Sequence, residues 1–137
     1  MKLTFASLSE PYASSELVTI AVPVDGAFED LKFRPIFRRF SDDERTEILR
    51  GSANLAQKLQ DGGEVEDGDR QFTDEAVTRK VLAGWQDWST GEDVPFDEQS
   101  LAVVLRLHGA SGAIALNWLQ SVEQRAPEGN SEGLPST

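Results

Sequence analysis

Cysteine is absent from the 137-residue chain, and His108 is the only histidine. The absence of cysteine excludes disulfide bonds, a thiolate nucleophile and every metal site built on cysteine. A single histidine leaves the common transition-metal ligand sets incomplete. We therefore expect no bound metal, and the lack of disulfides suits a reducing compartment.

Long apolar runs are missing as well. The uninterrupted apolar runs are only a few residues long, so no segment is expected to span a bilayer. The first residues, "MKLTFASLSEPYASSEL", carry one lysine and no sustained apolar stretch, which argues against a signal peptide. We expect a protein without membrane association that works in the cytoplasm.

Basic residues are scarce, since 13 Lys and Arg stand against 24 Asp and Glu, a formal net charge of −11 at pH 7. This excess disfavours binding to nucleic acid or to anionic membranes and favours a basic partner. The acids are scattered rather than clustered, which is unlike a mimic of nucleic acid. The hydrophobic content of 39% and the chain length are typical of one globular domain.

Catalytic motifs are missing too, because no Gly-x-Ser-x-Gly elbow and no glycine-rich phosphate loop occurs. Acid pairs such as Asp42-Asp43 lie in predicted first turns of helices, where the helix dipole accounts for them. His108 lies on the apolar face of a predicted helix, which favours a core or rim position over a general base. We expect no catalytic residue and no cofactor, and hence a protein that is not an enzyme.

What is present begins with a β-rich segment, residues 1–40. The stretch 17–24, "LVTIAVPV", is β-branched and aliphatic, and the Asp25-Gly26 dipeptide after it predicts a tight hairpin turn. A further short strand is expected at Lys2–Ala6. Alternation along the return strand places five residues on one face: Leu31, Phe33, Pro35, Phe37 and Arg39.

A helix is predicted over 41–60, because Ser41 and Glu44 form a capping box at its start. Gly51 inside this helix lowers its propensity by about 1 kcal/mol relative to alanine. Residues 61–71 are acidic and rich in glycine and predict a flexible loop. The ligand spacing of an EF-hand is absent from this loop, so a solvated loop is favoured over a calcium site.

Residues 72–125 are predicted to be helical, with Thr73 and Asp97 as N-cap residues and a glycine-rich break before the last helix. The tail 126–137 is rich in Pro, Gly and Ser and is expected to be disordered. The fold class is α+β, with a small N-terminal antiparallel sheet followed by about four α-helices in one domain, 1–125. One helix has its apolar residues at helical spacing: Val77, Val81, Trp85 and Trp88.

Aromatic residues are the candidates for a binding surface. Trp85 and Trp88 cannot both point fully inward from one helix with comfort, so the spacing predicts one in the core and the other as a partly exposed lid, without deciding which. As a separate hypothesis, we expect Trp85 to anchor the core and Trp88 to face a partner. The run "KFRPIFRRF" is either a partner-binding strand or a solvent-facing strand whose arginines pair with nearby acids. The predicted partner-binding residues are Phe33, Phe37, Arg38, Arg39, Trp88 and Phe96.

In their order and spacing these segments resemble the tail assembly chaperones of long-tailed phages, particularly those of proteobacterial prophages. The matching elements are a hairpin leading into "FRPIFRRFSDDERTEIL", a glycine-rich linker, and "VLAGWQDW" followed by "EDVPFDEQSLAVVL". The resemblance covers residues 17–122. Trp88 departs from the family's pattern, in which a smaller aliphatic or polar residue is expected.

The resemblance implies a role without catalysis. Chaperones of this family bind the tape measure protein, keep it soluble and help to recruit tail tube subunits, and they are absent from the finished virion. In many relatives a translational frameshift near the C-terminus yields a longer product whose extra domain contacts the tube protein, and the tail at 126–137 would suit a short form. The expected partners are the tape measure protein, the tail tube protein and further copies of the chain, in the host cytoplasm.

Two other classes stay open. An acidic phage-encoded inhibitor or adaptor would occupy a site on a basic host protein, and as a nucleic-acid decoy it would need acids arrayed on one surface. An unrecognised small enzyme would need a pocket around His108, with Asp87 or Glu123 as a carboxylate partner.

Overall fold

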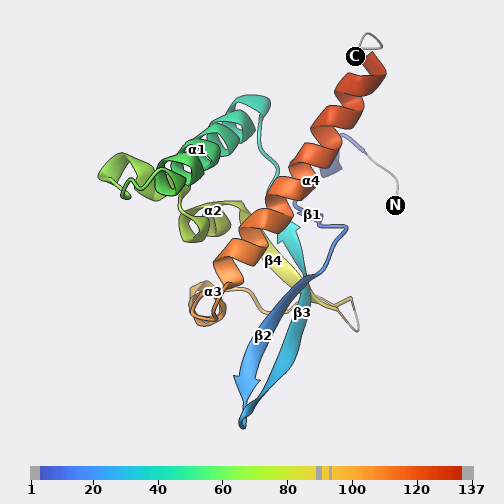
Figure 1. Cartoon of the computed structure of the whole chain (residues 1–137). Helices are drawn as coiled ribbons and strands as arrows, with labels where there is room; N and C mark the ends of the chain where they lie inside the picture. The colour runs from blue at the N-terminus through green and yellow to red at the C-terminus, as the bar shows by residue number, and fades with distance from the viewer. Residues whose placement is uncertain (1–3, 89–90, 93, 134–137) are drawn as a thin grey trace.

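The computed structural model describes residues 4–88, 91–92 and 94–133, with side chains up to residue 121. Its centre is a four-stranded antiparallel sheet against which helices pack (Figure 1). This arrangement confirms the predicted α+β class with about four α-helices. In chain order the elements are η1 (Ala6–Ser9), β1 (Tyr12–Ala13), β2 (Val18–Val24), β3 (Ala27–Phe37), α1 (Asp42–Gln60), η2 (Asp67–Phe72), α2 (Asp74–Val81), β4 (Leu82–Asp87), α3 (Glu98–Leu105) and α4 (Ala110–Gly133).

The N-terminal segment differs from the predicted strand at Lys2–Ala6. Residues 1–3 lie outside the described part, and the chain from Thr4 turns into the 3-10 helix η1. The Ser7 hydroxyl donates to the Thr4 carbonyl at 2.7 Å, a local bond that competes with strand pairing. The strand comes later, as β1, and pairs with the end of β3.

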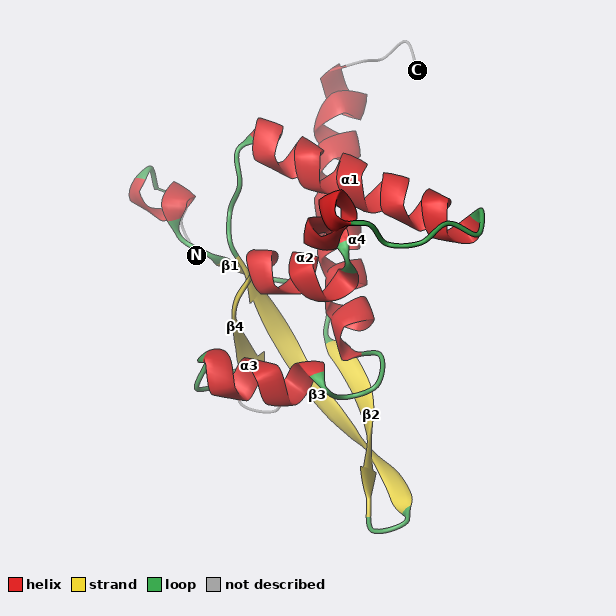
Figure 2. Ribbon diagram, turned by 90° about the vertical axis from the view of Figure 1, so that its left-hand side faces the viewer, coloured by secondary structure: helices red, strands yellow, loops and turns green. Residues whose placement is uncertain are grey.

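The β2–β3 hairpin turns at Asp25 and Gly26 as predicted. Their φ angles are 48° and 82°, the positive values that a two-residue hairpin turn needs. The hairpin projects beyond the helices (Figure 2). Phe28, near its tip, is 73% exposed. The outer part of the hairpin therefore adds apolar surface rather than core.

β3 is the central strand, and Phe33, Pro35 and Phe37 are buried on one face, as the alternation predicts. A proline is accommodated here because pairing with β2 ends at Phe33 and pairing with β1 begins at Ile36. The carbonyl of Pro35 accepts a hydrogen bond from the Ser14 amide at 2.8 Å on that edge. The missing N–H of proline thus falls in the gap between two partner strands.

The segment after α2 is a strand, so the helix predicted to run through Trp88 is wrong from Leu82 onward. α2 ends at Val81, and β4 pairs antiparallel with β3, with Trp85 opposite Pro35. The reason is tertiary, because β3 has a second edge that needs a partner. Pairing along that edge overrides a helical spacing carried by only a few residues.

The core lies between the sheet and the helices. α4 is also fixed to the segment before β2, because the Ser14 hydroxyl donates to Asn117 Oδ1 at 2.7 Å in a buried hydrogen bond. The buried apolar side chains that form the core are Val18, Ile20, Phe33, Phe37, Ile48, Val77, Val81, Leu82, Trp85, Leu101, Ala110, Ile114, Ala115 and Trp118.

The predicted helix starts are confirmed. Ser41 and Glu44 form the capping box of α1, Thr73 accepts from an amide of α2, and Asp97 accepts from an amide of α3. Gly109, with a φ of 78°, provides the predicted break, and α3 and α4 meet there at 102°. In the described part of the chain no single helix is long and apolar enough to cross a membrane, and only this bent pair reaches that length and composition together.

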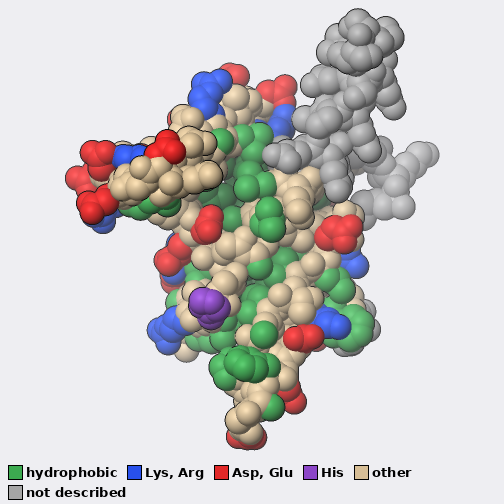
Figure 3. Space-filling view, viewed as in Figure 1, with side chains coloured by type: hydrophobic (Ala, Val, Ile, Leu, Met, Phe, Trp, Pro, Cys, Tyr) green, Lys and Arg blue, Asp and Glu red, His purple; other side chains and the backbone are tan. Residues whose placement is uncertain are grey.

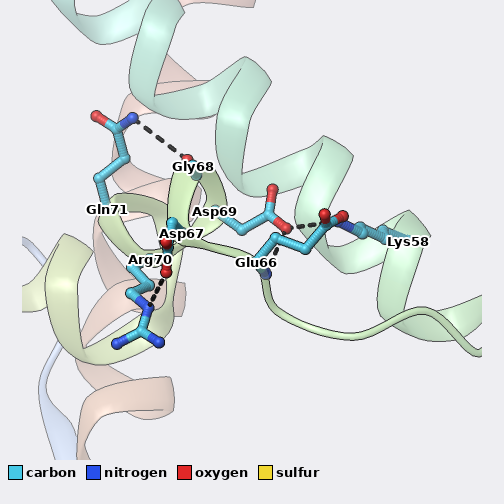
Figure 4. A network of polar contacts seen from close by, with 7 residues as sticks. All are labelled: Lys58, Glu66, Asp67, Gly68, Asp69, Arg70 and Gln71. Carbon is cyan, nitrogen blue, oxygen red and sulfur yellow. Dashed lines mark hydrogen bonds and ion pairs between the residues drawn. The ribbon is translucent and has the colours of Figure 1, made fainter.

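The acidic segment 61–71 was predicted to be a loop, but much of it belongs to the 3-10 helix η2 beside α1 (Figure 4). Lys58 Nζ in α1 pairs with Glu66 and, at 2.6 Å, with Asp69. The hydrogen bond between Lys58 and Asp69 raises the pKa of the ammonium and lowers the pKa of the carboxyl. The ion pairs of Lys58 with Glu66 and Asp69 therefore hold this segment against α1.

α4 extends to Gly133, past residue 125, where the folded domain was predicted to end. The backbone is helical over 126–133, where the sequence predicts a disordered tail, and 134–137 lie outside the described residues. Disorder of 126–137 in solution stays a prediction.

Candidate functional site

An apolar groove of about 540 Å³ lies between α3 and the sheet, and we call it the α3 groove. Its walls come from β3, from β4 with the loop after it, and from α3, which are far apart in the sequence. Its apolar lining consists of Leu31, Phe33, Trp85, Val94, Pro95, Val103 and Val104, and its polar lining of Lys32, Asp87, Asp97, Gln99 and Ser100.

Trp85 forms the floor of the groove and is only 5% exposed, which confirms its predicted place in the core. Its ring meets Phe33 and Phe96 edge-on, with centroid distances of 5.7 and 5.0 Å. The indole N–H donates to the Pro95 carbonyl at 3.1 Å. A buried indole with its donor satisfied and two aromatic neighbours is held in one orientation, so the floor is rigid.

The loop after β4 folds back along the strand. The Val94 amide donates to the Trp85 carbonyl at 3.0 Å, and the Asp87 amide donates to the Glu92 carbonyl at 2.9 Å. Gly91, with a φ of 73°, reverses the chain between them. Because backbone hydrogen bonds place Val94, this wall of the groove is formed before any ligand arrives.

Exposed apolar side chains surround the floor. Leu31, Val94 and Val103 line the groove and are exposed, Val103 by 54%. Trp88 is 56% exposed, which confirms that it is partly exposed as predicted, and Lys32 Nζ lies 5.1 Å from its ring centroid. Trp88 is not itself a lining residue of the α3 groove. Leu31, Val94 and Val103 together form an apolar surface that a partner could cover.

The charged lining is mainly acidic. Asp87 ends β4 and Asp97 precedes α3, while Lys32 is the one basic residue among the described residues of the lining. Hydrogen bonds from the Ser100 backbone and side chain lower the pKa of Asp97. The Asp97 carboxylate is therefore ionised at neutral pH.

Of the predicted partner-binding residues, Phe33 lines the α3 groove, Phe96 packs on its floor residue Trp85, and Trp88 lies outside its lining. Phe37 is fully buried, so the prediction that it faces a partner is wrong. Phe33 is also buried but lines the α3 groove, and its role in partner binding stays a prediction. The alternation of β3 turns both rings toward the helices, although the edge of Phe33 reaches the groove wall. Phe96 is half-buried and packs on Trp85.

Arg38 and Arg39 are exposed but do not line the α3 groove. They follow β3 at the end of the strand far from Leu31. The Arg39 Nε donates to the Glu10 carbonyl at 2.8 Å, and its guanidinium carbon lies 5.1 Å from the ring centroid of Tyr12. Arg39 therefore fixes the N-terminal segment, which is a structural role.

Three groove residues, Leu31, Val94 and Val103, were not predicted as binding residues. Leu31 shares the alternating face of β3 and is the first exposed member of it, which the sequence could have indicated. Val103 lies outside the apolar stripe of α3 and reads as an ordinary surface residue. Val94 lies in a loop whose course depends on β4, so nothing local marks it.

No group of three or more His, Cys, Asp or Glu residues in the described part of the chain could hold a metal ion. His108 was predicted on an inner helix face, but α3 ends at Leu105 and His108 is exposed in the turn that follows (purple in Figure 3). His108 does not line the α3 groove.

A second apolar groove of about 690 Å³ involves α1, η2 and α4, and Figure 3 shows hydrophobic side chains between α1 and α4. Phe72 occupies one wall of it and packs against Gly51. The α3 groove differs in having the aromatic floor of Trp85, which is held by the Pro95 carbonyl and by the rings of Phe33 and Phe96. We therefore take the α3 groove as the candidate site.

Comparison of the chain with protein-family models, with curated proteins and with solved structures gives no match.

Proposed function

We propose that the protein is a tail assembly chaperone of a long-tailed phage and that it holds the tape measure protein through the α3 groove. The order and spacing of the sequence motifs favour this family. The observation that carries the proposal is an exposed apolar groove with a rigid aromatic floor on a strongly acidic molecule. The chaperone acts in the host cytoplasm, recruits tail tube subunits and is absent from the virion.

The energetics of the groove suit a client that must later be released. Burying one large apolar side chain contributes about 1.5–3 kcal/mol, and a few such side chains surround the groove. Ordering the client costs free energy that offsets part of the gain from these buried side chains. The remaining binding free energy allows reversible binding rather than permanent association. The net charge of −11 keeps complexes with an apolar client apart from one another.

Paired substitutions test the use of the groove. Val103 and Leu116 lie on helices and are 54% and 53% exposed, but only Val103 lines the α3 groove. We expect Val103→Glu to abolish solubilisation of the co-expressed tape measure protein, because a carboxylate cannot be buried against an apolar client. Leu116→Glu should leave the yield of soluble client unchanged. If the two variants gave the same yield of soluble client, binding through this groove would be contradicted.

The acidic inhibitor or adaptor predicts a different pattern. Such a protein would bind a basic host protein through its acids, and Val103→Glu would leave that binding intact. If the wild-type chain failed to solubilise the tape measure protein, this alternative would replace the chaperone.

A further inference from the structure

Building on the proposed function, we propose that the client segment held in the α3 groove is an apolar stretch that carries a lysine or arginine beside its apolar side chains. The lining combines an aromatic and aliphatic floor with Asp87 and Asp97 on its walls. An apolar segment with an adjacent cation satisfies both features. An acidic segment would place like charges together next to a surface of low polarity, where repulsion is strongest.

Asp97 is held ready to receive such a cation. Its Oδ1 accepts the Ser100 amide at 2.8 Å, so the helix start fixes the carboxylate in place. A carboxylate offers about four acceptor positions, and the cap bond leaves capacity for an incoming ammonium or guanidinium. Because Asp97 and Glu98 already occupy the N-terminus of α3, the helix end offers little to an anionic ligand.

The one basic residue among the described lining residues does not offset this preference. The Lys32 ammonium lies over the Trp88 ring, which is not part of the lining and holds the cation there. The described lining therefore contains two carboxylates and one cation that is held by an aromatic ring outside it. The chain as a whole, at −11, also attracts a basic segment over longer distances.

Three designed peptides test this chemistry directly. They share one apolar helical core and carry Lys, Gln or Glu at the same flanking positions. Their affinities are measured by titration calorimetry for the wild-type protein and for Asp87→Asn/Asp97→Asn, in which asparagine keeps the cap of α3. We expect the Lys peptide to bind tightest and to lose about three- to tenfold in affinity in the double variant, whereas the Gln peptide should not change.

Equal affinities of the Lys and Gln peptides for both proteins would overturn the inference. Should the double variant fail to fold, Asp97→Asn alone answers the same question, with a loss of about two- to fivefold expected for the Lys peptide.

A peptide series that tiles the tape measure protein separates the two proposals. If tape measure peptides bind equally well with and without lysine or arginine, this inference is overturned and the proposed chaperone function still stands. Binding of the designed Lys peptide without any tape measure peptide supports the groove chemistry and removes the chaperone function.

Discussion

At the scale of single residues, Gly51 and Gly84 differ in whether the surrounding structure has room for a side chain. A Cβ on Gly51 would overlap the ring of Phe72, so the α1–η2 contact requires glycine there. A Cβ on Gly84 would meet Ile36 Cδ1 at 3.6 Å, which is an ordinary contact. The sequence marks Gly51 only as a residue that lowers helix propensity. Its contact with Phe72 could not be predicted, because Phe72 lies well outside the same helix.

We predict that Gly51→Ala lowers the free energy of unfolding by about 1–2 kcal/mol, since overpacking against Phe72 outweighs the gain in helix propensity. Gly84→Ala, the matched control, should change it by less than about 1 kcal/mol. Urea unfolding followed by circular dichroism measures both. A Gly51→Ala variant more stable than the wild type would mean that the Phe72 ring moves aside without cost.

Trp85 and Trp88 differ more than their spacing suggests. We predict that Trp85→Ala destabilises the protein by about 3–5 kcal/mol, because it empties the floor of the α3 groove. Trp88→Ala should cost less than about 1 kcal/mol and remove most of the tryptophan fluorescence that acrylamide quenches. Similar losses of stability in the two variants, measured by thermal unfolding, would contradict the assignment of Trp85 to the core and Trp88 to the exposed surface.

At the scale of elements, turns and helix caps depend on neighbouring residues and could be predicted from the sequence. Strand pairings between residues far apart in the chain could not. The turn at Asp25 and Gly26 and the caps at Ser41, Thr73 and Asp97 are local, and each was found. β4 was not found, because its strand character comes from the open edge of β3, which precedes it by a long stretch of helix. The walls of the α3 groove depend on that pairing, which is why most of them escaped prediction.

The contact between η2 and α1 predicts a dependence of stability on pH. The folded pKa of Asp69 is lowered, so its contribution is present above the ordinary aspartate pKa and is lost as the pH falls through the lowered value. The folded pKa of Lys58 is raised, so its contribution is present below the ordinary lysine pKa and is lost as the pH rises through the raised value.

Comparison with Lys58→Met isolates this contact. We expect the wild type to unfold at a higher temperature than the variant across neutral pH, with the gap closing below about pH 4 as Asp69 is protonated. The gap should close again in strong base, above about pH 10. A gap that is constant from acid to neutral pH would show that the ion pairs do not hold η2 on α1.

At the scale of the whole molecule, an acidic protein carries the α3 groove and a projecting hairpin with an exposed tip (Figure 2). Its composition predicts the charge, and the order of its motifs suggests a chaperone. The α3 groove joins β3, β4 with the loop after it and α3, so its shape follows only from the assembled fold. Phe33 was predicted to bind a partner because it is aromatic, whereas Val94 and Val103 in the walls are aliphatic and were not predicted.

Co-expression with the tape measure protein of the same phage, followed by size-exclusion chromatography with light scattering, is the direct test of client binding. We expect a soluble complex in which several copies of this protein elute with each client chain, because a long client offers many apolar segments of similar kind. An insoluble client, with this protein eluting alone, would contradict client binding.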